Sequence, residues 1–459
     1  MAASEADDNS WSARPRDGTP PSVSMLAATA LVVANMIGVG VFTSLGFQVK
    51  DIPSGFSVLL LWAIGGVVAL CGVFAYAELG AMFPRSSGEY NFLSRSFHPA
   101  VGFMAGFVSA TVGFAAPVAL SAMACGQYAA VVLPGVPSRL LAVAVVWLVS
   151  LVQLGGVKHS STFQLVSTIL KVGLIAAFLI AGVTLPSPQP ISFAPALSDL
   201  GLITSGPFAI GLVFVMYAFS GWNAASYIIG EMHAPEQGLP RSLLAGTAIV
   251  LVLYIALNAV FLLAAPMASL AGQLEVASIA GSYIFGAFGG QIVAAMICIG
   301  LVPSIAAMMW IGPRVTMTMG EDVPMLAVFA RRSRGGAPIY ALLFQLAVAN
   351  LMLLTDSFEA VLDFIQFALL ACSFLTVLGL FKLRITRPDL ARPYRAWGYP
   401  LTPAVFLLVT GFMMYYLFAQ RPLQAGLGTL VMMCGLLIYL LAHRHPGGKV
   451  AAYPGHEQR

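Results

Sequence analysis

Long apolar segments, each about as long as a membrane is thick, constrain this chain more than any other feature. The hydrocarbon core of a bilayer needs roughly 20 apolar residues in a helix. The sequence contains about twelve such segments, at approximately 24–45, 56–83, 98–133, 138–156, 161–185, 203–230, 241–265, 279–312, 337–355, 358–383, 400–419 and 423–443. The runs are continuous and do not alternate as lipid-facing strands do, so an all-α membrane protein is predicted.

Composition supports the same class. Of the 459 residues 59% are hydrophobic and only 9% are charged, whereas soluble proteins carry roughly 25% charged residues to cover their surface. A soluble enzyme, a nucleic-acid-binding protein and a disordered protein are therefore excluded. The formal net charge of +4 is too small to indicate a polyanionic partner.

The basic residues predict the orientation in the membrane. With the N-terminus inside, all but four of the 22 Lys and Arg residues fall in cytoplasmic tails, loops or helix ends. Lys50, Arg139 and Arg421 fall outside, and Lys171 lies within a span. The positive-inside rule then predicts a multi-pass protein of the cell (inner) membrane with both termini cytoplasmic. The polar first 23 residues lack a signal-peptide pattern, so the first helix should be retained.

No signature of redox, metal or enzyme chemistry is present. The five cysteines show no CxxC spacing, and all six histidines sit at helix ends, loops or tails. The motifs HExxH, GxSxG and GxxxxGK are absent. We expect no cofactor, no metal and no enzymatic activity.

Two apolar segments contain glycine-centred interruptions. The first has Gly38 and Gly40 in mid-helix, and the sixth has Ser220-Gly221 between aromatic residues. Glycines also serve as close-packing positions in membrane helices, which is the alternative interpretation. Unwinding there would free backbone groups, which is tolerable only where they line a cavity or bind a ligand. Interruptions at corresponding positions of two halves indicate a transport site at the membrane midplane.

The two interruptions also predict the organisation of the chain. Each opens a block of five helices, and an odd number of helices makes the two blocks inverted relative to each other. The predicted parts are a cytoplasmic tail (1–23), a first five-helix repeat (24–185), an inverted second repeat (203–385), two additional helices (400–443) and a cytoplasmic tail (444–459).

Such interruptions suit a zwitterionic ligand. Amide groups around Val39 and Gly40 would receive a carboxylate, helped by the helix dipole. Freed carbonyl groups near Ile37, Ala218 and Phe219 would accept hydrogen bonds from an α-ammonium group. The candidate substrate-binding residues are therefore Ile37, Gly38, Val39, Gly40, Ala218, Phe219, Ser220, Gly221 and Trp222.

Four motifs, in order along the chain, carry a resemblance to a known family. They are Gly38-Val39-Gly40-Val41-Phe42, the run from Phe83 to Tyr90, Phe219-Ser220-Gly221-Trp222-Asn223 leading to Gly230-Glu231, and Arg392-Pro393-Tyr394-Arg395 with Trp397-Gly398-Tyr399-Pro400. The chain resembles the amino acid–polyamine–organocation (APC) superfamily, near its bacterial amino acid permease and L-type amino acid transporter branches. The resemblance implies a LeuT-type 5+5 inverted repeat plus two C-terminal helices, alternating access, and Phe219 as an outer gate.

Lys171 is the one basic residue deep in a span, roughly 15 Å along the fifth helix. A charge there is costly and is a functional hypothesis by default, although a purely structural tie between helices is the alternative. The resemblance matches Lys171 to a lysine of sodium-independent members, whose ammonium replaces a sodium ion and bridges the fifth helix to the broken first helix. We therefore expect sodium-independent transport, by exchange, proton coupling or uniport.

The remaining charges are interpreted as interfacial or loop groups. Those at helix ends are Glu78, Glu231, Arg314 and Asp363, which we expect to pair with neighbours or water. Glu231 and Arg314 are also a candidate inner gate, because both terminate helices that should move. Glu89, with Arg85 and Arg95, is interpreted as loop architecture.

The wall of the expected site favours an uncharged substrate. Residues 109–117 of the third span contain no acid, and neither does the eighth span, so neutral L-amino acids are expected. The alternatives are a cationic amino acid or polyamine transporter of the same fold, or a non-transporting receptor or channel-like protein. The loop 134–139 has no cysteine for a disulfide-linked heavy chain, which leaves a monomer or a weak homodimer.

Overall fold

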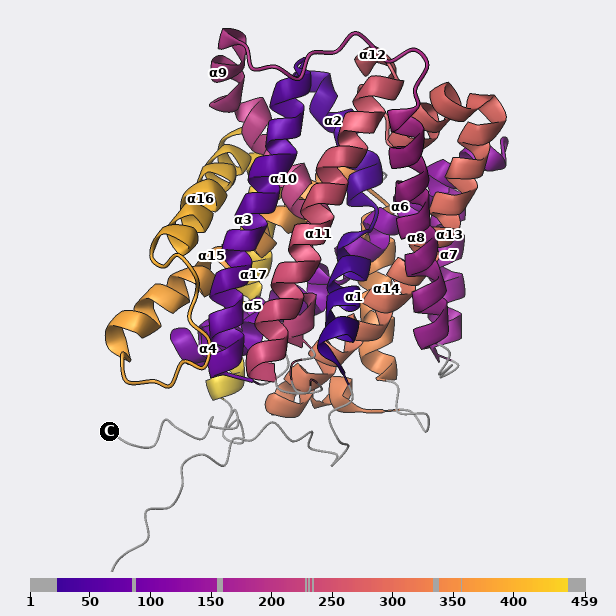
Figure 1. The fold of residues 1–459 in the computed structure, drawn as a ribbon. Coiled ribbons are helices and arrows are strands. Elements are labelled where there is room, and N and C mark those ends of the chain that lie inside the picture. The colour runs from indigo at the N-terminus through magenta and orange to yellow at the C-terminus, as the bar shows by residue number, and fades with distance from the viewer. Residues whose placement is uncertain are drawn as a thin grey trace, which may run out of the picture.

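The computed structural model describes residues 23–84, 88–154, 160–227, 229, 232, 235–332, 338–355 and 357–444. Within these ranges the regular structure is helical, apart from one isolated bridge between Val23 and Met232. The long helices run along a common direction and form one bundle (Figure 1). The all-α prediction is confirmed for this part of the chain.

Most spans are single helices whose bounds lie within a few residues of the apolar segments. They are α3 (Gly55–Met82), α7 (Ser138–Leu154), α8 (Ser160–Val183), α11 (Pro235–Ala264), α14 (Ile339–Leu353), α15 (Phe358–Thr386), α16 (Leu401–Gln420) and α17 (Pro422–Arg444). Serine side chains cap several starts, as when Ser54 accepts from the amide of Ser57 at 3.2 Å and Ser357 from that of Ala360 at 3.2 Å. Local chemistry thus sets where these helices begin.

Other spans are discontinuous. The first is α1 (Met25–Met36) followed by α2 (Gly40–Asp51), and the sixth is α10 (Gly206–Ala218) followed by turns and a 3-10 helix η2 (Ala224–Tyr227). The third is α5 (Pro99–Val108), a π-helical turn η1 (Ser109–Gly113) and α6 (Ala115–Val132). The sixth segment was expected to extend to residue 230, but its α-helix ends at Ala218.

The eighth segment differs most from expectation. Helix α13 (Val276–Asp322) is far longer than the expected 279–312. It bends at Gly286, whose φ of 77° lies in the left-handed region that glycine adopts readily. Hydropathy alone merges the two parts, because both are apolar.

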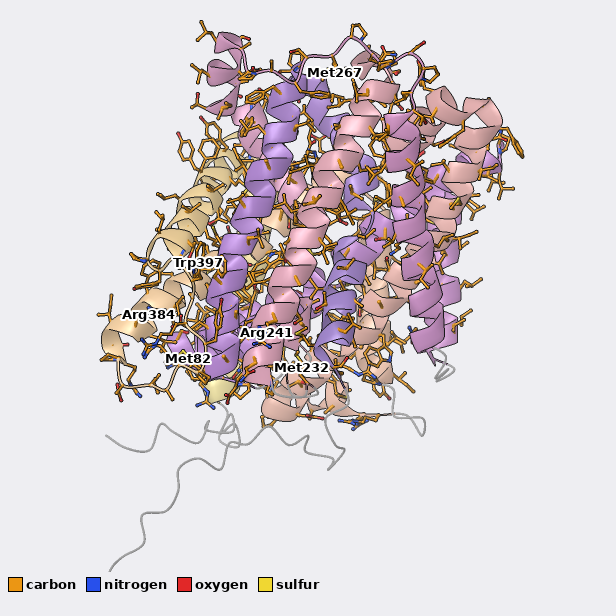
Figure 2. The ribbon with its side chains drawn as sticks, in the orientation of Figure 1. Met82, Met232, Arg241, Met267, Arg384 and Trp397 are labelled. Carbon is orange, nitrogen blue, oxygen red and sulfur yellow. The ribbon has the colours of Figure 1, made fainter. Side chains whose placement is uncertain are left out.

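Short helices mark the two ends of the bundle. Helices α9 (Leu197–Ile203) and α12 (Met267–Leu270) lie at one end and α4 (Glu89–Ser96) at the other (Figure 1). The short 3-10 helix η4 (Pro324–Ala330) connects α13 toward α14. The basic residues Arg241 and Arg384 lie near the α4 end, opposite Met267 (Figure 2).

Length and hydropathy identify the membrane spans. In the described part of the chain, eight helices are long and apolar enough to cross a membrane, or nine if the bent pair α9–α10 is one span. Three shorter apolar helices accompany them: Ser138–Gln153, Ile169–Val183 and Ile339–Leu353. This is a multi-pass membrane protein.

Two acids that were expected to pair with neighbours do so. Glu78 on α3 is fully buried, 3.0 Å from the Nε atom of Arg384 and 3.4 Å from that of Arg392. Asp363 on α15 lies 3.3 Å from Arg421. A buried carboxylate needs such partners, because an unpaired charge costs several kcal/mol out of water. Glu78 thereby ties α3 to the end of α15 and to the segment after it.

Candidate functional site

The first interruption is a three-residue break between α1 and α2. Helix α1 ends at Met36, and Ile37 leaves the helical region with φ −72° and ψ 77°. After Gly38, the backbone of Val39 is helical again and starts α2. The first amide N–H groups of α2 therefore have no hydrogen-bond acceptor within that helix, as at every helix N-terminus.

The second interruption ends α10 in a series of tight turns. The amide of Ser220 donates to Tyr217 O at 2.9 Å, and that of Trp222 donates to Phe219 O at 3.1 Å. Gly221 has a φ of 98°, which explains the glycine, because a side chain is strained there. Both interruptions predicted from the glycines are present in the structure.

The two interruptions contact each other through their glycines. A Cβ atom on Gly40 would lie 2.5 Å from the Cα atom of Ala218, so only glycine allows α2 and α10 to come this close. A Cβ atom on Gly221 would lie 3.0 Å from Asn35 on α1. Each broken helix thus packs its glycine against the backbone or side chain of the other.

A tyrosine hydroxyl bridges both breaks. Tyr254, fully buried on α11, hydrogen-bonds to Met36 O and lies 3.2 Å from Ala218 O. These are carbonyl groups that the breaks deprive of helical partners. Ala218 O is one of the carbonyl groups predicted to accept from a ligand, but the protein already offers it the Tyr254 hydroxyl, as it offers the Trp222 amide to Phe219 O.

A small cavity lies where the two breaks meet. It measures about 350 Å³ including its open part, and its wall includes five of the predicted residues: Gly38, Val39, Gly40, Ala218 and Ser220. Helix α6 contributes Pro117 and Ser121, and α13 contributes Ser304 and Met308. Among the described residues its lining carries no charged side chain. Polar groups there are backbone atoms, hydroxyls and the Asn35 amide.

A large cavity adjoins it on the side of η2 and α4. It measures about 1220 Å³ including its open part, and it shares Asn35, Pro117, Tyr217, Ser220 and Met308 with the small cavity. Predicted residues Gly221 and Trp222 line only the large cavity. Ile37 and Phe219 line neither.

Phe219 does not occupy the position expected of an outer gate. Its ring is fully buried and packs against Tyr254 at 5.1 Å and Trp62 at 6.4 Å, measured between ring centroids. The aromatic contacts that connect α2 with α10 and α15 belong to other residues. The Phe47 ring stacks on Phe214 at 5.0 Å and on Phe358 at 5.8 Å.

Lys171 lies beside the small cavity. Its side chain is buried, its stem packs over Gly300 of α13, and its ammonium donates to the hydroxyl of Ser304, a residue of the cavity wall. This hydrogen bond goes to α13, whereas the family resemblance implied a bridge from Lys171 to the broken first helix. Because Gly300 has no side chain, the lysine lies flat on α13 and reaches Ser304 one turn later.

Glu89 is the residue that the sequence-based interpretation misplaced. It was interpreted as loop architecture, but it is 4% exposed and lines the large cavity. Its Oε1 atom accepts hydrogen bonds from the hydroxyls of Tyr76 on α3 and of Ser373 on α15, the latter at 2.8 Å. Burial raises the pKa of the Glu89 carboxyl, while these two hydrogen bonds act to lower it.

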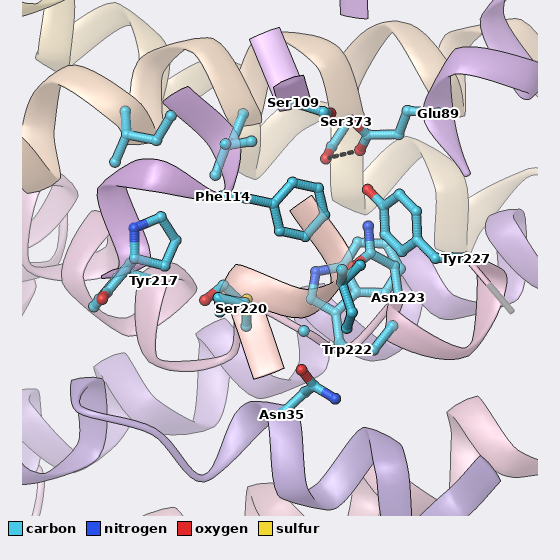
Figure 3. Close-up of a pocket in the computed structure, with 18 of the residues that line it drawn as sticks. Asn35, Glu89, Ser109, Phe114, Tyr217, Ser220, Trp222, Asn223, Tyr227 and Ser373 are labelled. Atoms are coloured by element: carbon cyan, nitrogen blue, oxygen red, sulfur yellow. Dashed lines mark hydrogen bonds between the residues drawn. The ribbon is translucent and has the colours of Figure 1, made fainter. Parts of the chain in front are cut away.

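Figure 3 shows how the large cavity is arranged around this acid. The Tyr227 hydroxyl points toward Glu89, and the rings of Phe114 and Trp222 lie below it. The sequence of the third and eighth spans predicted a pocket wall without acids, whereas Glu89 lines the large cavity. The acid comes from α4, between two spans, where a search of the spans does not find it.

Of the two candidate residues of the inner gate, Arg314 and Glu231, the structure describes only Arg314. Arg314 on α13 stacks on Trp310, with its guanidinium carbon 3.4 Å from the ring centroid, and donates to Trp310 O at 2.6 Å. Trp310 lines the large cavity. Glu231 lies outside the described residues. In the described ranges, no group of three His, Cys, Asp or Glu side chains is placed to hold a metal ion.

Comparison with known proteins identifies the family to which this chain belongs. The model of the family described as amino acid permease matches residues 23–441. Asc-type amino acid transporter 1 of Mus musculus is 24% identical over 429 residues, which cover 91% of this chain and 80% of the relative. The b(0,+)-type amino acid transporter 1 of Mus musculus is 26% identical over 436 residues, covering 91% and 87%. Large neutral amino acids transporter small subunit 2 of Homo sapiens is 24% identical over 436 residues, covering 91% and 80%.

Proposed function

This chain belongs to the amino acid permease family, and from that premise we propose that it is a secondary amino acid transporter working by alternating access. One observation carries the proposal. Two interrupted helices, α1–α2 and α10–η2, come from distant parts of the chain and meet around a small cavity lined by backbone groups. Irregular backbone at membrane depth is tolerated where it binds a ligand or lines a cavity.

The proposed architecture has twelve spans. Eight long helices, the bent pair α9–α10 and the three shorter apolar helices together make this number. Residues 24–185 and 203–385 form the two inverted LeuT-type repeats, with 400–443 as two added helices. The support is that each interruption falls in the first span of its block.

The proposed substrates are neutral L-amino acids. Their carboxylate binds the amides that open α2, near Val39 and Gly40, where the positive end of the helix dipole lies. Their ammonium binds free carbonyl lone pairs and the side chains of Asn35 and Ser220. An uncharged cavity of about 350 Å³ favours uncharged side chains. The named specificities of two of the relatives, Asc-type and large neutral amino acids, support this class.

Transport is proposed to be sodium-independent. The buried ammonium of Lys171 donates to Ser304 in the wall of the small cavity, and the family resemblance matches it to an ammonium that replaces a sodium ion. Lys171 holds Ser304, and through it α13, against the cavity. The coupling is then exchange or proton-linked uptake.

The proposed orientation places the α4 end in the cytoplasm of the cell. Arg241 and Arg384 lie near that end (Figure 2), while Lys50 is in the last turn of α2, a helix at the other end (Figure 1). The large cavity is then the inner vestibule, and the stack of Phe47, Phe214 and Phe358 closes the outer side. No disulfide-linked heavy chain is expected at loop 134–139, which has no cysteine, and the chain acts as a monomer or weak homodimer.

A substrate panel tests the proposal. Purified protein in liposomes preloaded with unlabelled amino acid should take up radiolabelled alanine or leucine. Arginine and putrescine should compete poorly, and uptake should persist when sodium is replaced by choline. Uptake of arginine but not of alanine or leucine would assign the cationic alternative. No uptake of any member would favour a receptor or channel-like protein.

A further inference from the structure

Two buried acids at the same end of the bundle are treated differently by the fold. Glu78 is neutralised by the guanidinium groups of Arg384 and Arg392. Glu89 has hydroxyl donors, Tyr76 and Ser373, and none of the ion pairs formed among the described residues includes it. Burying a carboxylate is costly unless other groups compensate its charge, and an ammonium group of a ligand in the cavity would do so for Glu89.

The side chain of Glu89 is held in place rather than loosely exposed. Tyr76 belongs to α3 and Ser373 to α15, and both donate to Oε1. Helix α4 itself packs against α5 and α15. Three elements therefore fix one carboxyl group at the wall of the large cavity, which is the preorganisation that a binding site requires.

Aromatic rings surround the space in front of this carboxyl group. Phe114, Trp222 and Tyr227 line the same cavity, with Phe114 and Tyr227 in an edge contact at 6.0 Å. Aromatic faces attract organic cations, most strongly where water is excluded. A carboxylate among aromatic faces is suited to an ammonium group and unsuited to a carboxylate.

We propose that Glu89 forms a second ammonium-binding site in the large cavity, separate from the small cavity between the broken helices. The site takes primary ammonium groups, either the α-ammonium of a departing substrate or the side-chain ammonium of a cationic one. The inference rests on the proposed transport function for its role, because the ammonium moves from Ser220 and Asn35, shared by both cavities, to Glu89.

Binding of a carboxylate-free amine tests the site apart from transport. Isoamylamine has the side chain and ammonium of leucine without its carboxylate, so it lacks the group that the start of α2 binds. Titrated into purified protein, it should change the tryptophan fluorescence saturably, because Trp222 and Trp310 line the cavity. Glu89→Gln should weaken this binding at least about tenfold. Isovalerate has a carboxylate and no ammonium group, so its binding should be the same in the wild type and in Glu89→Gln.

Matched variants control for folding and for charge. Glu89→Gln keeps the acceptor for Tyr76 and Ser373, and its thermal unfolding should match that of the wild type to within a few degrees. Glu321→Gln removes an exposed acid on α13 that pairs with Arg332, and it should leave amine binding unchanged. Glu89→Asp keeps the charge on a shorter side chain and should bind isoamylamine more tightly than Glu89→Gln does.

Exchange assays then separate the two sources of the ammonium group. If the α-ammonium binds, Glu89→Gln raises the KM for internal leucine and lysine alike. If the side chain binds, it raises the KM for lysine alone. Equal isoamylamine binding by wild type and Glu89→Gln, or none by the wild type, overturns the proposal. A wild type that binds the amine through Glu89 but exchanges no amino acid would refute the transport function and leave this site standing.

Discussion

The two adjoining cavities offer a ligand different chemistry. The small cavity, about 350 Å³, is lined by backbone atoms of two broken helices and by uncharged side chains. The large cavity, about 1220 Å³, contains aromatic rings and a buried carboxyl group. In the first, recognition depends on where the backbone is interrupted. In the second, it depends on one charged side chain, so the two cavities should respond to different mutations.

The largest effect is expected from a side chain between the broken helices. Gly40→Val places a Cβ 2.5 Å from Ala218 Cα, a backbone atom that yields only if α10 shifts. Overpacking costs roughly 1–3 kcal/mol or more, so exchange should fall about 100-fold. Amine binding at Glu89 should persist. Gly426→Ala on α17, where a Cβ would meet nothing within 4 Å, is the control.

Lys171→Ala should have the second-largest effect on transport, because it removes the positive charge beside the small cavity and leaves the large cavity unchanged. Loss of a buried hydrogen bond from a charged donor to Ser304 costs about 1.5–3 kcal/mol, or about 10- to 100-fold in transport. Lys50→Ala, an exposed lysine in the last turn of α2, should behave as wild type. Unchanged rate and affinity in Lys171→Ala would contradict its assigned role.

Tyr254→Phe should have a smaller effect on the same cavity. It removes the donor to Met36 O and Ala218 O without changing the shape of the ring. A net hydrogen bond is worth about 0.5–1.5 kcal/mol, so transport should fall roughly 2- to 12-fold. Tyr415→Phe on lipid-facing α16, where the tyrosine is 68% exposed, should be neutral. Equal rates for the two variants would remove Tyr254 from the site.

The smallest effect is a pH dependence confined to the large cavity. Burial raises the pKa of Glu89, and only its ionised form binds ammonium. Affinity for isoamylamine should therefore be full above this pKa and fall as the pH drops through it, by up to about tenfold per unit. The groups facing Glu89 are Tyr76, Tyr227 and Cys372. A Glu89→Gln profile as steep as that of the wild type would assign the titration to another group.

The fold was largely predictable because the membrane imposes a simple length requirement on each helix. The positions of both interruptions were predictable as well, since Gly40 and Gly221 occupy places where a side chain would clash or strain the backbone. The length of the eighth segment allowed for a bend, but its position at Gly286 was not predicted, because the flanking residues are apolar on both sides.

The site was predictable only in part. Tyr254 and Met36 are 218 residues apart, and Glu89 and Ser373 are 284 apart, so no local pattern reports either contact. Phe219 was expected to be an outer gate only from the family resemblance, and its ring packs against Tyr254 and Trp62, two contacts that no local pattern in the sequence reports. Asn35, a polar residue in the last turn of α1 just before the first break, was the available sequence signal for its place in the cavity wall.

We propose that amino acids bind between the two broken helices without sodium. Counterflow measures this most directly: liposomes loaded with unlabelled leucine are given trace radiolabelled leucine outside, in choline buffer. Wild-type protein should accumulate label equally with choline and with sodium, and Gly40→Val should accumulate almost none. Accumulation that requires sodium, or that survives in Gly40→Val, would contradict the account.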